Sequence, residues 1–224
     1  MAKRSDGKSR VGATANGRVH VIDHPLVAHM LTEARDRKTR PDRFRRLLAQ
    51  IGALLAYEVT RDVQLDLVAI DTPMEKLRAC RLRLPITVVP ILRAGLGMAE
   101  GILDLIPEAH AGHIGMFRDE KRLQPVSYYE KLPLSIAKGP VILVDPMLAT
   151  GGSALAAVQL LKTRGCTDIR YLCLIASPEG VAKLTGEFPT LPIYTAAIDR
   201  ELDERGYILP GLGDAGDRLY GTTD

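Results

Sequence analysis

The chain has 224 residues, of which 46% are hydrophobic and 25% are charged, a composition that suits one globular domain with a sizeable core. Its formal net charge of only +3 gives no electrostatic argument for a nucleic-acid or membrane partner. No apolar run approaches the roughly 18 residues of a membrane span, and the N-terminus lacks the apolar core of a signal peptide. Three cysteines without CxxC spacing indicate free thiols, so we expect a cytoplasmic protein.

Residues 1–18 are basic and rich in glycine, serine, alanine and asparagine, with almost no apolar side chains. Such a segment buries too little surface to offset the entropy lost on ordering, so we predict that it is disordered. Its basic residues are spread out and have no aromatic neighbours, which favours a solvated tail over a nucleic-acid-binding arm. The remaining residues, 19–224, are predicted to form a single domain.

The first part of this domain is predicted to contain two helices and a hairpin. His24-Pro25 is typical of a helix start, and a second helix begins near Pro41, where apolar residues follow a three-four spacing to about Glu58. The outer face of this second helix is basic and is expected to be solvated, at Arg43, Arg45 and Arg46. The stretch Asp66–Leu84 alternates on both sides of a break at Thr72-Pro73, which predicts a hairpin arm and a plausible contact to a neighbouring subunit.

From Ile86 onward, apolar strands alternate with helices. We predict five strands, at Ile86–Leu92, His113–Phe117, Val141–Val144, Ile169–Ala176 and Ile193–Ile198. Helices are expected between them, at Met98–Ile106, Ser153–Arg164 and Glu179–Leu184. This alternation is typical of a parallel, doubly wound α/β sheet, whose ligands lie at the carboxyl ends of the strands. One polar stretch, Asp119–Lys131, is expected to form a long exposed loop.

Charged side chains directly follow three of the predicted strands. Arg93, Arg118 and Asp145 each stand just past a strand end, so the sheet is expected to bring them to one edge. The stretch Val141–Ser153, VILVDPMLATGGS, combines a strand, an acid and a small-residue turn at a helix start. In such a turn the backbone N–H groups and the helix dipole favour an anion, and glycine lets the backbone approach it closely. The sequence therefore predicts a phosphate site at Ala149–Ser153.

Several familiar motifs are absent or misplaced. The GxGxxG string at Gly211–Gly216 has only eight residues after it, whereas a dinucleotide-binding fold needs a helix there and an acid about 20 residues further on. No GxxxxGK[ST] motif occurs, which argues against a P-loop NTPase. The five histidines lack metal-ligand spacing, and no Ser/His/Asp or Cys/His arrangement stands out. The glycine-rich stretch Gly206–Arg218 is instead expected to form a fixed closing loop.

Three stretches give the chain a specific resemblance. Val141–Ser153 resembles the 5-phosphoribosyl diphosphate (PRPP) motif of type I phosphoribosyltransferases, most of which have a second acid where this chain has Pro146. That departure is typical of the uracil phosphoribosyltransferases, which Val88–Met98 (VVPILRAGLGM) and Gly206–Thr222 (GYILPGLGDAGDRLYGT) also resemble. The resemblance covers the chain except for its basic tail. It implies a parallel-sheet phosphoribosyltransferase fold with flanking helices, a hairpin arm and a base-binding hood formed by the N-terminal part and residues 200–224.

The activity implied by this resemblance is a step of pyrimidine salvage, in which PRPP and uracil give UMP and pyrophosphate. Breaking the bond at the ribose C1 builds positive charge on the sugar and negative charge on pyrophosphate, so positioning and electrostatics should dominate catalysis. Mg²⁺ is implied as the partner of the diphosphate, and without the second acid it is expected to arrive bound to PRPP, with no direct protein ligand. The family also implies a homodimer or larger homo-oligomer and, in some members, a GTP effector.

The same resemblance implies the site residues. The PRPP site is implied at Arg93, Arg118, Asp145, Pro146, Met147, Leu148, Ala149, Thr150, Gly151, Gly152, Ser153 and Asp214. Uracil is implied to bind main-chain groups of the closing loop, at Ile208, Gly213, Asp214 and Ala215. Catalysis is expected to depend on Asp145, Arg118 and Asp214, and no general base is evident. The stretch Asp119–Lys131 is expected to act as a lid that keeps water from C1.

Two other functions stay open at this point. The first is a regulator that keeps this fold, senses nucleotides and binds RNA, although the small net charge argues against a basic RNA-binding face. The second is the same transferase chemistry with another base, such as a purine or orotate. The closing loop favours uracil, and one assay with several bases discriminates these alternatives.

Overall fold

The computed structural model describes residues 11–13, 18–83, 85–118 and 125–222. One sheet runs through the centre of the molecule, in the strand order β1-β2-β12-β11-β9-β5-β7-β8. Its strands are β1 Val11–Ala13, β2 Val19–Ile22, β5 Thr87–Leu92, β7 His113–Arg118, β8 Pro125–Lys131, β9 Val141–Val144, β11 Ile169–Ala176 and β12 Ile193–Ile198. Two short strands extend it, β6 (His110–Ala111) beside β5 and β10 (Met147–Leu148) beside β11. The pairs from β2 to β7 are parallel, whereas the edge strands β1 and β8 run antiparallel to their neighbours.

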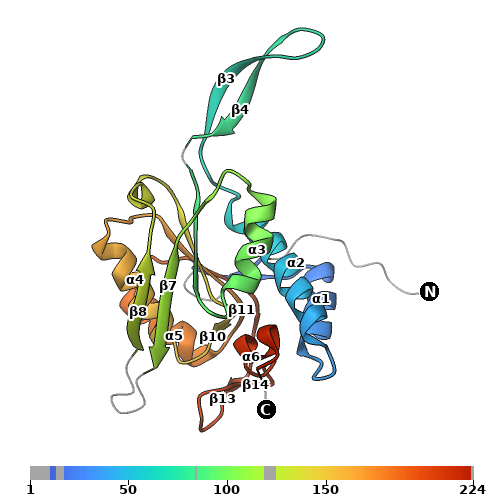
Figure 1. Cartoon of the computed structure of the whole chain (residues 1–224), viewed down its shortest axis with the longest axis vertical. Helices are drawn as coiled ribbons and strands as arrows, with labels where there is room; N and C mark the ends of the chain where they lie inside the picture. The colour runs from blue at the N-terminus through green and yellow to red at the C-terminus, as the bar shows by residue number, and fades with distance from the viewer. Residues whose placement is uncertain (1–10, 14–17, 84, 119–124, 223–224) are drawn as a thin grey trace, which may run out of the picture.

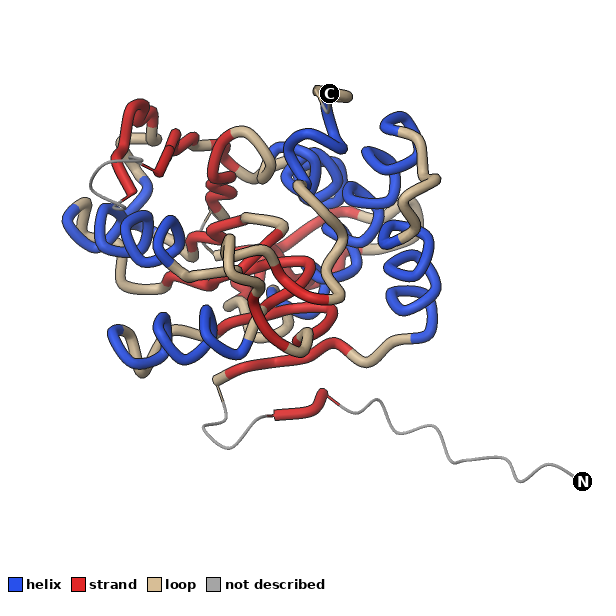
Figure 2. Tube along the Cα trace, turned by 90° about the horizontal axis from the view of Figure 1, so that it is seen from below, coloured by secondary structure: helices blue, strands red, loops and turns tan. Residues whose placement is uncertain are grey.

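Helices cover both faces of this sheet, as Figures 1 and 2 show. One face is covered by α1 (Pro25–Arg35), α2 (Pro41–Val59) and α3 (Leu96–Leu105), and the other by α4 (Gly152–Thr163) and α5 (Pro178–Glu187). The smaller elements are the 3-10 turn η1 (Ile136–Lys138), the strand pair β13 (Glu201–Leu202) and β14 (Ile208–Leu209), and the helix α6 (Ala215–Tyr220). None of the described helices combines the length and the apolar character needed to cross a membrane.

The central strands are buried between these two helical layers. Every residue of β9 and of β11 is buried, which explains why both strands are nearly continuous apolar runs. Helix α2 places its buried side chains at the predicted three-four spacing, from Phe44 to Val59. Helix α3 lies so close to α2 that a Cβ on Gly101 would clash with the Ala49 carbonyl oxygen. The predicted α/β architecture, a parallel-dominated sheet with flanking helices, is therefore confirmed.

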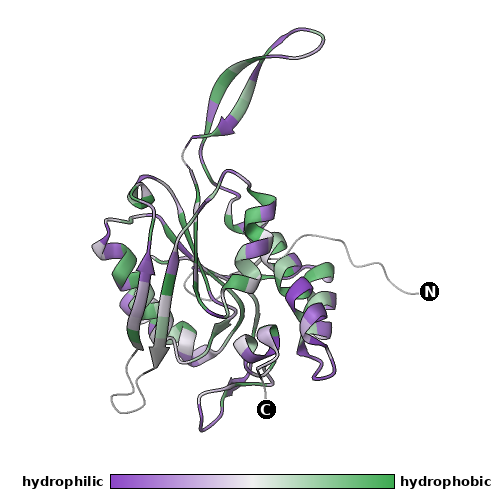
Figure 3. Cartoon of the chain, viewed as in Figure 1, coloured by the Kyte–Doolittle hydropathy of each residue, from purple (hydrophilic) through white to green (hydrophobic). Residues whose placement is uncertain are grey.

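The predicted hairpin arm is present. Strands β3 (Leu65–Asp71) and β4 (Lys76–Leu82) pair antiparallel and project from the body of the molecule, at the top of Figure 1. Both strands of the arm contain hydrophobic residues between hydrophilic ones, as the colouring of Figure 3 shows. Its large exposed apolar residues are Leu65, Leu67, Met74, Leu77 and Leu82. A hairpin that leaves such side chains in solvent presents an exposed apolar surface.

The prediction of one long exposed loop over Asp119–Lys131 is wrong in its second half. Pro125–Lys131 forms β8, which pairs antiparallel with β7 along the sheet edge. The strand was missed because it is polar: its backbone bonds to β7 while Tyr128 and Tyr129 stay about half exposed. Residues 119–124 lie outside the described residues. The lid stays a prediction, for a stretch whose second half is a paired strand.

Two predictions for the N-terminal half also need correction. Val11–Ala13, inside the segment predicted to be disordered, pair with β2 as strand β1, while residues 1–10 and 14–17 lie outside the described residues. The arginine face of α2 is not simply solvated. Arg43 forms an ion pair with Glu33 at 2.7 Å, and Arg45 donates a hydrogen bond to the Leu219 carbonyl oxygen at 2.6 Å. That face of α2 therefore fixes α1 and the C-terminal helix.

Candidate functional site

The carboxyl ends of β5 and β9 lie side by side, because these strands pair in parallel. Arg93 follows the end of β5 and Asp145 follows the end of β9. The turn after β5 presses on the end of β9, since a Cβ on Gly95 would lie 2.5 Å from the Val144 carbonyl oxygen. The structure thus brings these two predicted residues to one edge of the sheet.

Helix α4 begins with backbone donors for which the described part of the chain offers no acceptor. Its N-cap, Gly151, has φ +74°, a left-handed conformation that glycine adopts without strain, and no side chain caps the helix. The first backbone hydrogen bond into the helix runs from the Leu155 N–H to the Gly151 carbonyl at 3.0 Å. Among the described residues no acceptor bonds to the N–H groups of Gly152, Ser153 or Ala154. Three converging donors at a helix N-terminus form an anion site.

The carbonyl groups of the same loop point away from these donors, toward α5. The Leu148 carbonyl accepts the Ser177 N–H at 2.9 Å, and the Ala149 carbonyl accepts the Ser177 hydroxyl at 2.7 Å. Ser177 also caps α5, because its Oγ accepts the Gly180 N–H at 2.9 Å. Only glycine fits at position 180, where a Cβ would clash with the Ala149 carbonyl. This arrangement leaves the N–H side of the loop free for a ligand.

The predicted residues between Asp145 and this loop are fixed to the sheet. The Pro146 carbonyl accepts the N–H groups of Leu174 and Ile175, each at 3.0 Å. Met147 and Leu148 form β10, in parallel register with the end of β11. The loop therefore starts from a rigid strand edge, which limits how far a bound anion can displace it.

Asp145 is partly buried at the strand edge, where its backbone N–H donates to the Leu172 carbonyl at 3.1 Å. Burial raises the pKa of its carboxyl, a hydrogen bond from the Met147 N–H opposes this rise, and the negative charge of Asp214 adds to it, so that the pKa lies at about 7. Among the described residues Asp145 has no cationic partner. Asp145 and Asp214, 69 positions apart in the sequence, are thus close enough for their charges to interact.

A partly buried ion pair shapes the closing loop. The Arg35 guanidinium bonds to both oxygens of Asp199, at 2.5 and 2.8 Å, and to the Gly211 carbonyl at 2.7 Å. Asp199 Oδ2, which accepts one of these Arg35 bonds, also accepts the Gly211 N–H at 2.9 Å. Gly211 itself has φ +61°, and a Cβ there would clash with the Ile208 carbonyl. The roles of Arg35 and Asp199 are not predictable from the sequence, because the two residues are distant in the chain and no local pattern links them.

Arg218 fastens the same loop to the helical layer. Its guanidinium donates to the carbonyl oxygens of Leu212 at 2.8 Å and Asp36 at 2.7 Å, and also to that of Ala34. It also stacks over the Phe44 ring, with 4.2 Å from the guanidinium carbon to the ring centroid. The closing loop, the C-terminal end of α1 and the N-terminal end of α2 consequently form one packed unit at the carboxyl edge of the sheet, which we call the closing unit.

The closing unit faces the β9–α4 loop, which contains the predicted phosphate site Ala149–Ser153. A Cβ on Gly206 would lie 3.2 Å from the Thr150 methyl carbon, which places the two loops in contact. Of the residues predicted to bind uracil, Ile208 and Ala215 are buried, while Gly213 and Asp214 are exposed. Asp214 is the N-cap of α6, where its Oδ1 accepts the Asp217 N–H at 2.9 Å. The site therefore has two walls. We call the β9–α4 loop its lower wall and the closing loop its upper wall.

Helix α6 stands where the sequence predicts only a closing loop. The helix is only six residues long and contains a glycine, so periodicity gives no signal for it. It contacts Arg93 directly: the Arg93 guanidinium lies 3.8 Å from Asp217 and over the Tyr220 ring. Arg93 is therefore attached to the closing unit as well as to the sheet.

Arg118 is the one predicted site residue whose side chain lies outside the described residues. Its backbone is the last residue of β7 and pairs with Pro125, so it belongs to the strand rather than following it. Strand β7 is the parallel neighbour of β5, so the Arg118 backbone reaches the same sheet edge as Arg93.

The donor set at this edge suits a cation that brings its own ligands. Among the described residues no group of three or more His, Cys, Asp or Glu side chains is placed to hold a metal ion. Two interacting carboxylates, Asp145 and Asp214, are available. Mg²⁺ commonly binds one or two carboxylates and takes its remaining ligands from phosphates and water, which fits this arrangement.

Comparison with known proteins places this geometry in a family. Residues 21–222 match the family described as uracil phosphoribosyltransferase. The uracil phosphoribosyltransferase of Macrococcus caseolyticus is 54% identical over 206 residues, which cover 92% of this chain and 99% of that protein. That of Geobacillus kaustophilus is 53% identical over 207 residues, 92% of this chain and 99% of the relative.

Solved structures agree with the fold. The AQ2163 protein from Aquifex aeolicus superimposes with a TM-score of 0.87 at 35% identity, covering 92% of this chain and 99% of that one. The adenine phosphoribosyl transferase from Trypanosoma brucei has a TM-score of 0.54 at 14% identity over 88% of each chain, a likeness of fold alone. The family match spans nearly all of the described residues, including the β9–α4 loop and the closing unit. This chain belongs to the uracil phosphoribosyltransferase family.

Proposed function

We propose that this chain transfers the 5-phosphoribosyl group from PRPP to uracil and releases UMP and pyrophosphate, a step of pyrimidine salvage. Membership of the uracil phosphoribosyltransferase family supports this activity. The observation that carries it is the anion site at the start of α4, with three N–H groups that have no described acceptor, opposite the closing loop. One substrate is thereby assigned to each wall of the site.

On the lower wall, the loop Ala149–Ser153 binds the 5-phosphate through its free N–H groups, together with the Thr150 and Ser153 hydroxyls. Pro146, Met147 and Leu148 connect this loop to Asp145, whose carboxylate holds the ribose hydroxyls. Because positive charge builds at C1 in the transition state, an anion beside the ribose stabilises it more than the ground state.

At the pyrophosphate end, Arg93 balances the negative charge that builds on the leaving group, and we propose that Arg118 adds a second positive charge. Asp214 completes the PRPP site, since it interacts with Asp145 across the edge. Mg²⁺ bound to PRPP would neutralise part of the diphosphate charge and would lie near Asp145 and Asp214. These assignments make the catalytic groups Asp145, Arg118 and Asp214.

On the upper wall, main-chain groups of Ile208, Gly213 and Ala215 bind uracil, with Asp214 beside them. Main-chain recognition suits a small flat base whose edge has both donors and acceptors. The backbone at these positions is held in place, because Arg35 and Asp199 fix Gly211 and Arg218 fixes Leu212. A rigid turn lowers the entropy lost when the base binds.

A single assay tests this function. The protein is incubated with PRPP, Mg²⁺ and one of uracil, cytosine, hypoxanthine or orotate, and pyrophosphate and nucleotide are measured. Uracil alone is expected to give product, as UMP and pyrophosphate in equal amounts. Product with another base and none with uracil would overturn the assignment of the base. Product with no base at all would indicate hydrolysis of PRPP instead of transfer.

The assembly and its regulation are further parts of this proposal. The apolar side chains of the β3–β4 arm support a homodimer or larger homo-oligomer, because they are exposed on the surface that the described residues form. Light scattering of the wild type and of a Leu67→Ser/Leu77→Ser variant tests this. A GTP effector rests on the resemblance alone and is tested by adding GTP to the same assay. The three free cysteines support a cytoplasmic location.

A further inference from the structure

Arg93 needs support if it is to bind the diphosphate of PRPP. Its side chain is 58% exposed and lies on the turn after β5, so the strand fixes its backbone but not its guanidinium. Arginine has many rotamers, and an unrestrained one loses entropy when it binds a ligand. Restraint must come from neighbouring side chains, and in this structure they come from helix α6.

We propose that Asp217 and Tyr220 are positioning residues that hold the Arg93 guanidinium toward the diphosphate of PRPP. The proposal rests on the proposed function, in which Arg93 is a pyrophosphate ligand. Neither residue belongs to the PRPP or uracil sites assigned above. Both lie on α6, which begins at Ala215, the last residue proposed to bind uracil.

Three contacts join α6 to Arg93. An oxygen of Asp217 lies 3.8 Å from a terminal nitrogen of the guanidinium. The guanidinium carbon lies 5.5 Å from the centroid of the Tyr220 ring, within the range of a cation–π contact. The Tyr220 hydroxyl donates to the Arg93 carbonyl oxygen at 3.3 Å. One contact orients the charge, one limits the plane of the side chain, and one ties the backbone of the turn to α6.

Asp217 is itself held in place. The Thr222 hydroxyl donates to the same Asp217 oxygen at 2.7 Å, and the Asp217 N–H donates to Asp214 Oδ1 at 2.9 Å. Gly221, with φ +66°, reverses the chain so that Thr222 can reach back to Asp217. A line of contacts therefore connects Asp214 of the proposed PRPP site to Arg93 through Asp217.

The helix that holds these residues is attached to the rest of the fold. Arg45 donates to the Leu219 carbonyl, and Leu219 is buried against α3, where a Cβ on Gly97 would lie 2.7 Å from its side chain. Helix α6 is thus fixed in position, and its contacts restrain the Arg93 side chain. The ion pair with Asp217 is long and partly exposed, so it is weak. A diphosphate, which carries more negative charge, can therefore replace Asp217 as the main partner of the guanidinium.

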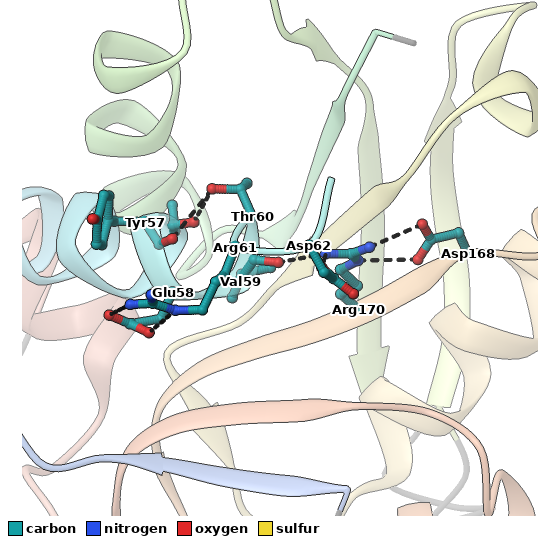
Figure 4. A network of polar contacts seen from close by, with 9 residues as sticks. Tyr57, Glu58, Val59, Thr60, Arg61, Asp62, Asp168 and Arg170 are labelled. Atoms are coloured by element: carbon teal, nitrogen blue, oxygen red, sulfur yellow. Dashed lines mark hydrogen bonds and ion pairs between the residues drawn. The ribbon is translucent and has the colours of Figure 1, made fainter. Parts of the chain in front are cut away.

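The chain has a matched control at the other end of the sheet. Arg61 forms an ion pair with Glu58 at 2.7 Å and lies over the Tyr57 ring at 5.7 Å, the same combination of arginine, acid and tyrosine. Figure 4 shows this cluster at the end of α2, beside the Arg170 network. Tyr57 and Tyr220 are both exposed, so replacing either one removes a comparable ring from the surface.

The test measures binding of inorganic pyrophosphate with Mg²⁺ by calorimetry, without uracil. Asp217→Asn and Tyr220→Leu are each expected to weaken this binding by about threefold, and Tyr57→Leu to leave it unchanged. Tyr220→Phe keeps the ring and should lose less than Tyr220→Leu. In steady-state kinetics the KM for PRPP should rise while kcat and the thermal midpoint stay near the wild-type values.

A second background separates positioning from a general effect on the fold. In Arg93→Ala protein the two α6 substitutions should no longer change the Kd for pyrophosphate, because they act through the guanidinium. An equal loss in both backgrounds would overturn the proposal, and so would tighter binding in Asp217→Asn, which would make Asp217 a competitor of the substrate. If the wild type binds pyrophosphate but makes no UMP from uracil, the proposed function fails instead.

Discussion

The two ends of the central sheet use arginine and aspartate in opposite ways. At the amino ends of the strands, the Arg170 side chain is only 8% exposed and bonds to Asp62 at 2.5 Å, to Asp168 at 3.0 Å and to the Val59 carbonyl at 2.5 Å (Figure 4). At the carboxyl ends, the Arg93 side chain is 58% exposed and its nearest acid is 3.8 Å away. The Arg170 guanidinium donates its hydrogen bonds to groups of the fold, whereas the donors of the Arg93 guanidinium stay available to a ligand.

The carboxylates differ in the same way. Asp168 accepts two hydrogen bonds from Arg170, whereas Asp145 has no described cationic partner and interacts unfavourably with Asp214. Desolvated charge without a partner costs stability, so a fold tolerates it where a ligand will supply the partner. The difference indicates that the amino ends stabilise the fold and the carboxyl ends bind substrate.

The largest expected effect comes from Asp145→Asn. This change removes the charge beside the ribose and keeps the size of the side chain, so kcat should fall by about 100-fold or more while the thermal midpoint holds or rises. Turnover of UMP formation and circular dichroism are measured on the same preparation. Asp62→Asn, at the other end of the sheet, is the control and should retain wild-type turnover. Equal turnover in the two variants would remove the functional contrast between the two ends.

Replacing one arginine at each end of the sheet should separate stability from substrate binding. Arg170→Met removes the bonds to Asp62, Asp168 and Val59, and we expect the free energy of unfolding to fall by about 2 kcal/mol with an unchanged KM for PRPP. Arg93→Met should leave the unfolding free energy within about 0.5 kcal/mol of wild type and raise the KM. Urea denaturation and steady-state kinetics measure both quantities. A loss of stability in Arg93→Met that matches Arg170→Met would contradict the comparison.

The sequence was sufficient wherever structure depends on a local pattern. The buried runs that became β9 and β11, the spacing of α2 and the small-residue turn after Asp145 each define their own conformation, so their positions followed from the residues alone. Their convergence followed from one general rule about the carboxyl ends of parallel strands. The placement of Arg93 and Asp145 at one edge needed no knowledge of their contacts.

The parts that could not be predicted depend on partners far away in the chain. Strand β8 is polar and exists because β7 pairs with it, and α6 is short and is held by Arg45 and by burial of Leu219. Arg35 and Asp199 are 164 positions apart, yet their ion pair shapes the closing loop. These features are set by tertiary contacts that override weak local signals, and they account for most of what the upper wall of the site needs.

The smallest expected effect is a change of kcat/KM with pH. It tests whether Asp145 binds the ribose as an ionised carboxylate without a cationic partner. Its pKa is raised to about 7 by burial, so below that pH the empty enzyme holds it protonated. If the ionised form binds the ribose, kcat/KM for PRPP should rise with pH and level off above about 7. Asp214→Asn removes the repelling charge, and the midpoint of the remaining activity should move to lower pH.

Stability should respond to pH in the opposite direction. An unfolded aspartate has a pKa of about 3.9, so between roughly pH 4 and pH 7 the native state holds a proton at Asp145 that the unfolded state has lost. The contribution of this group to the free energy of unfolding is therefore full below about pH 4 and declines as the pH rises through 7. Denaturation curves across this range, compared with Asp145→Asn, isolate the term, because the amide cannot titrate. Identical pH dependence in the two proteins would mean that Asp145 is already paired in the empty site, and the carboxyl ends would then resemble the amino ends.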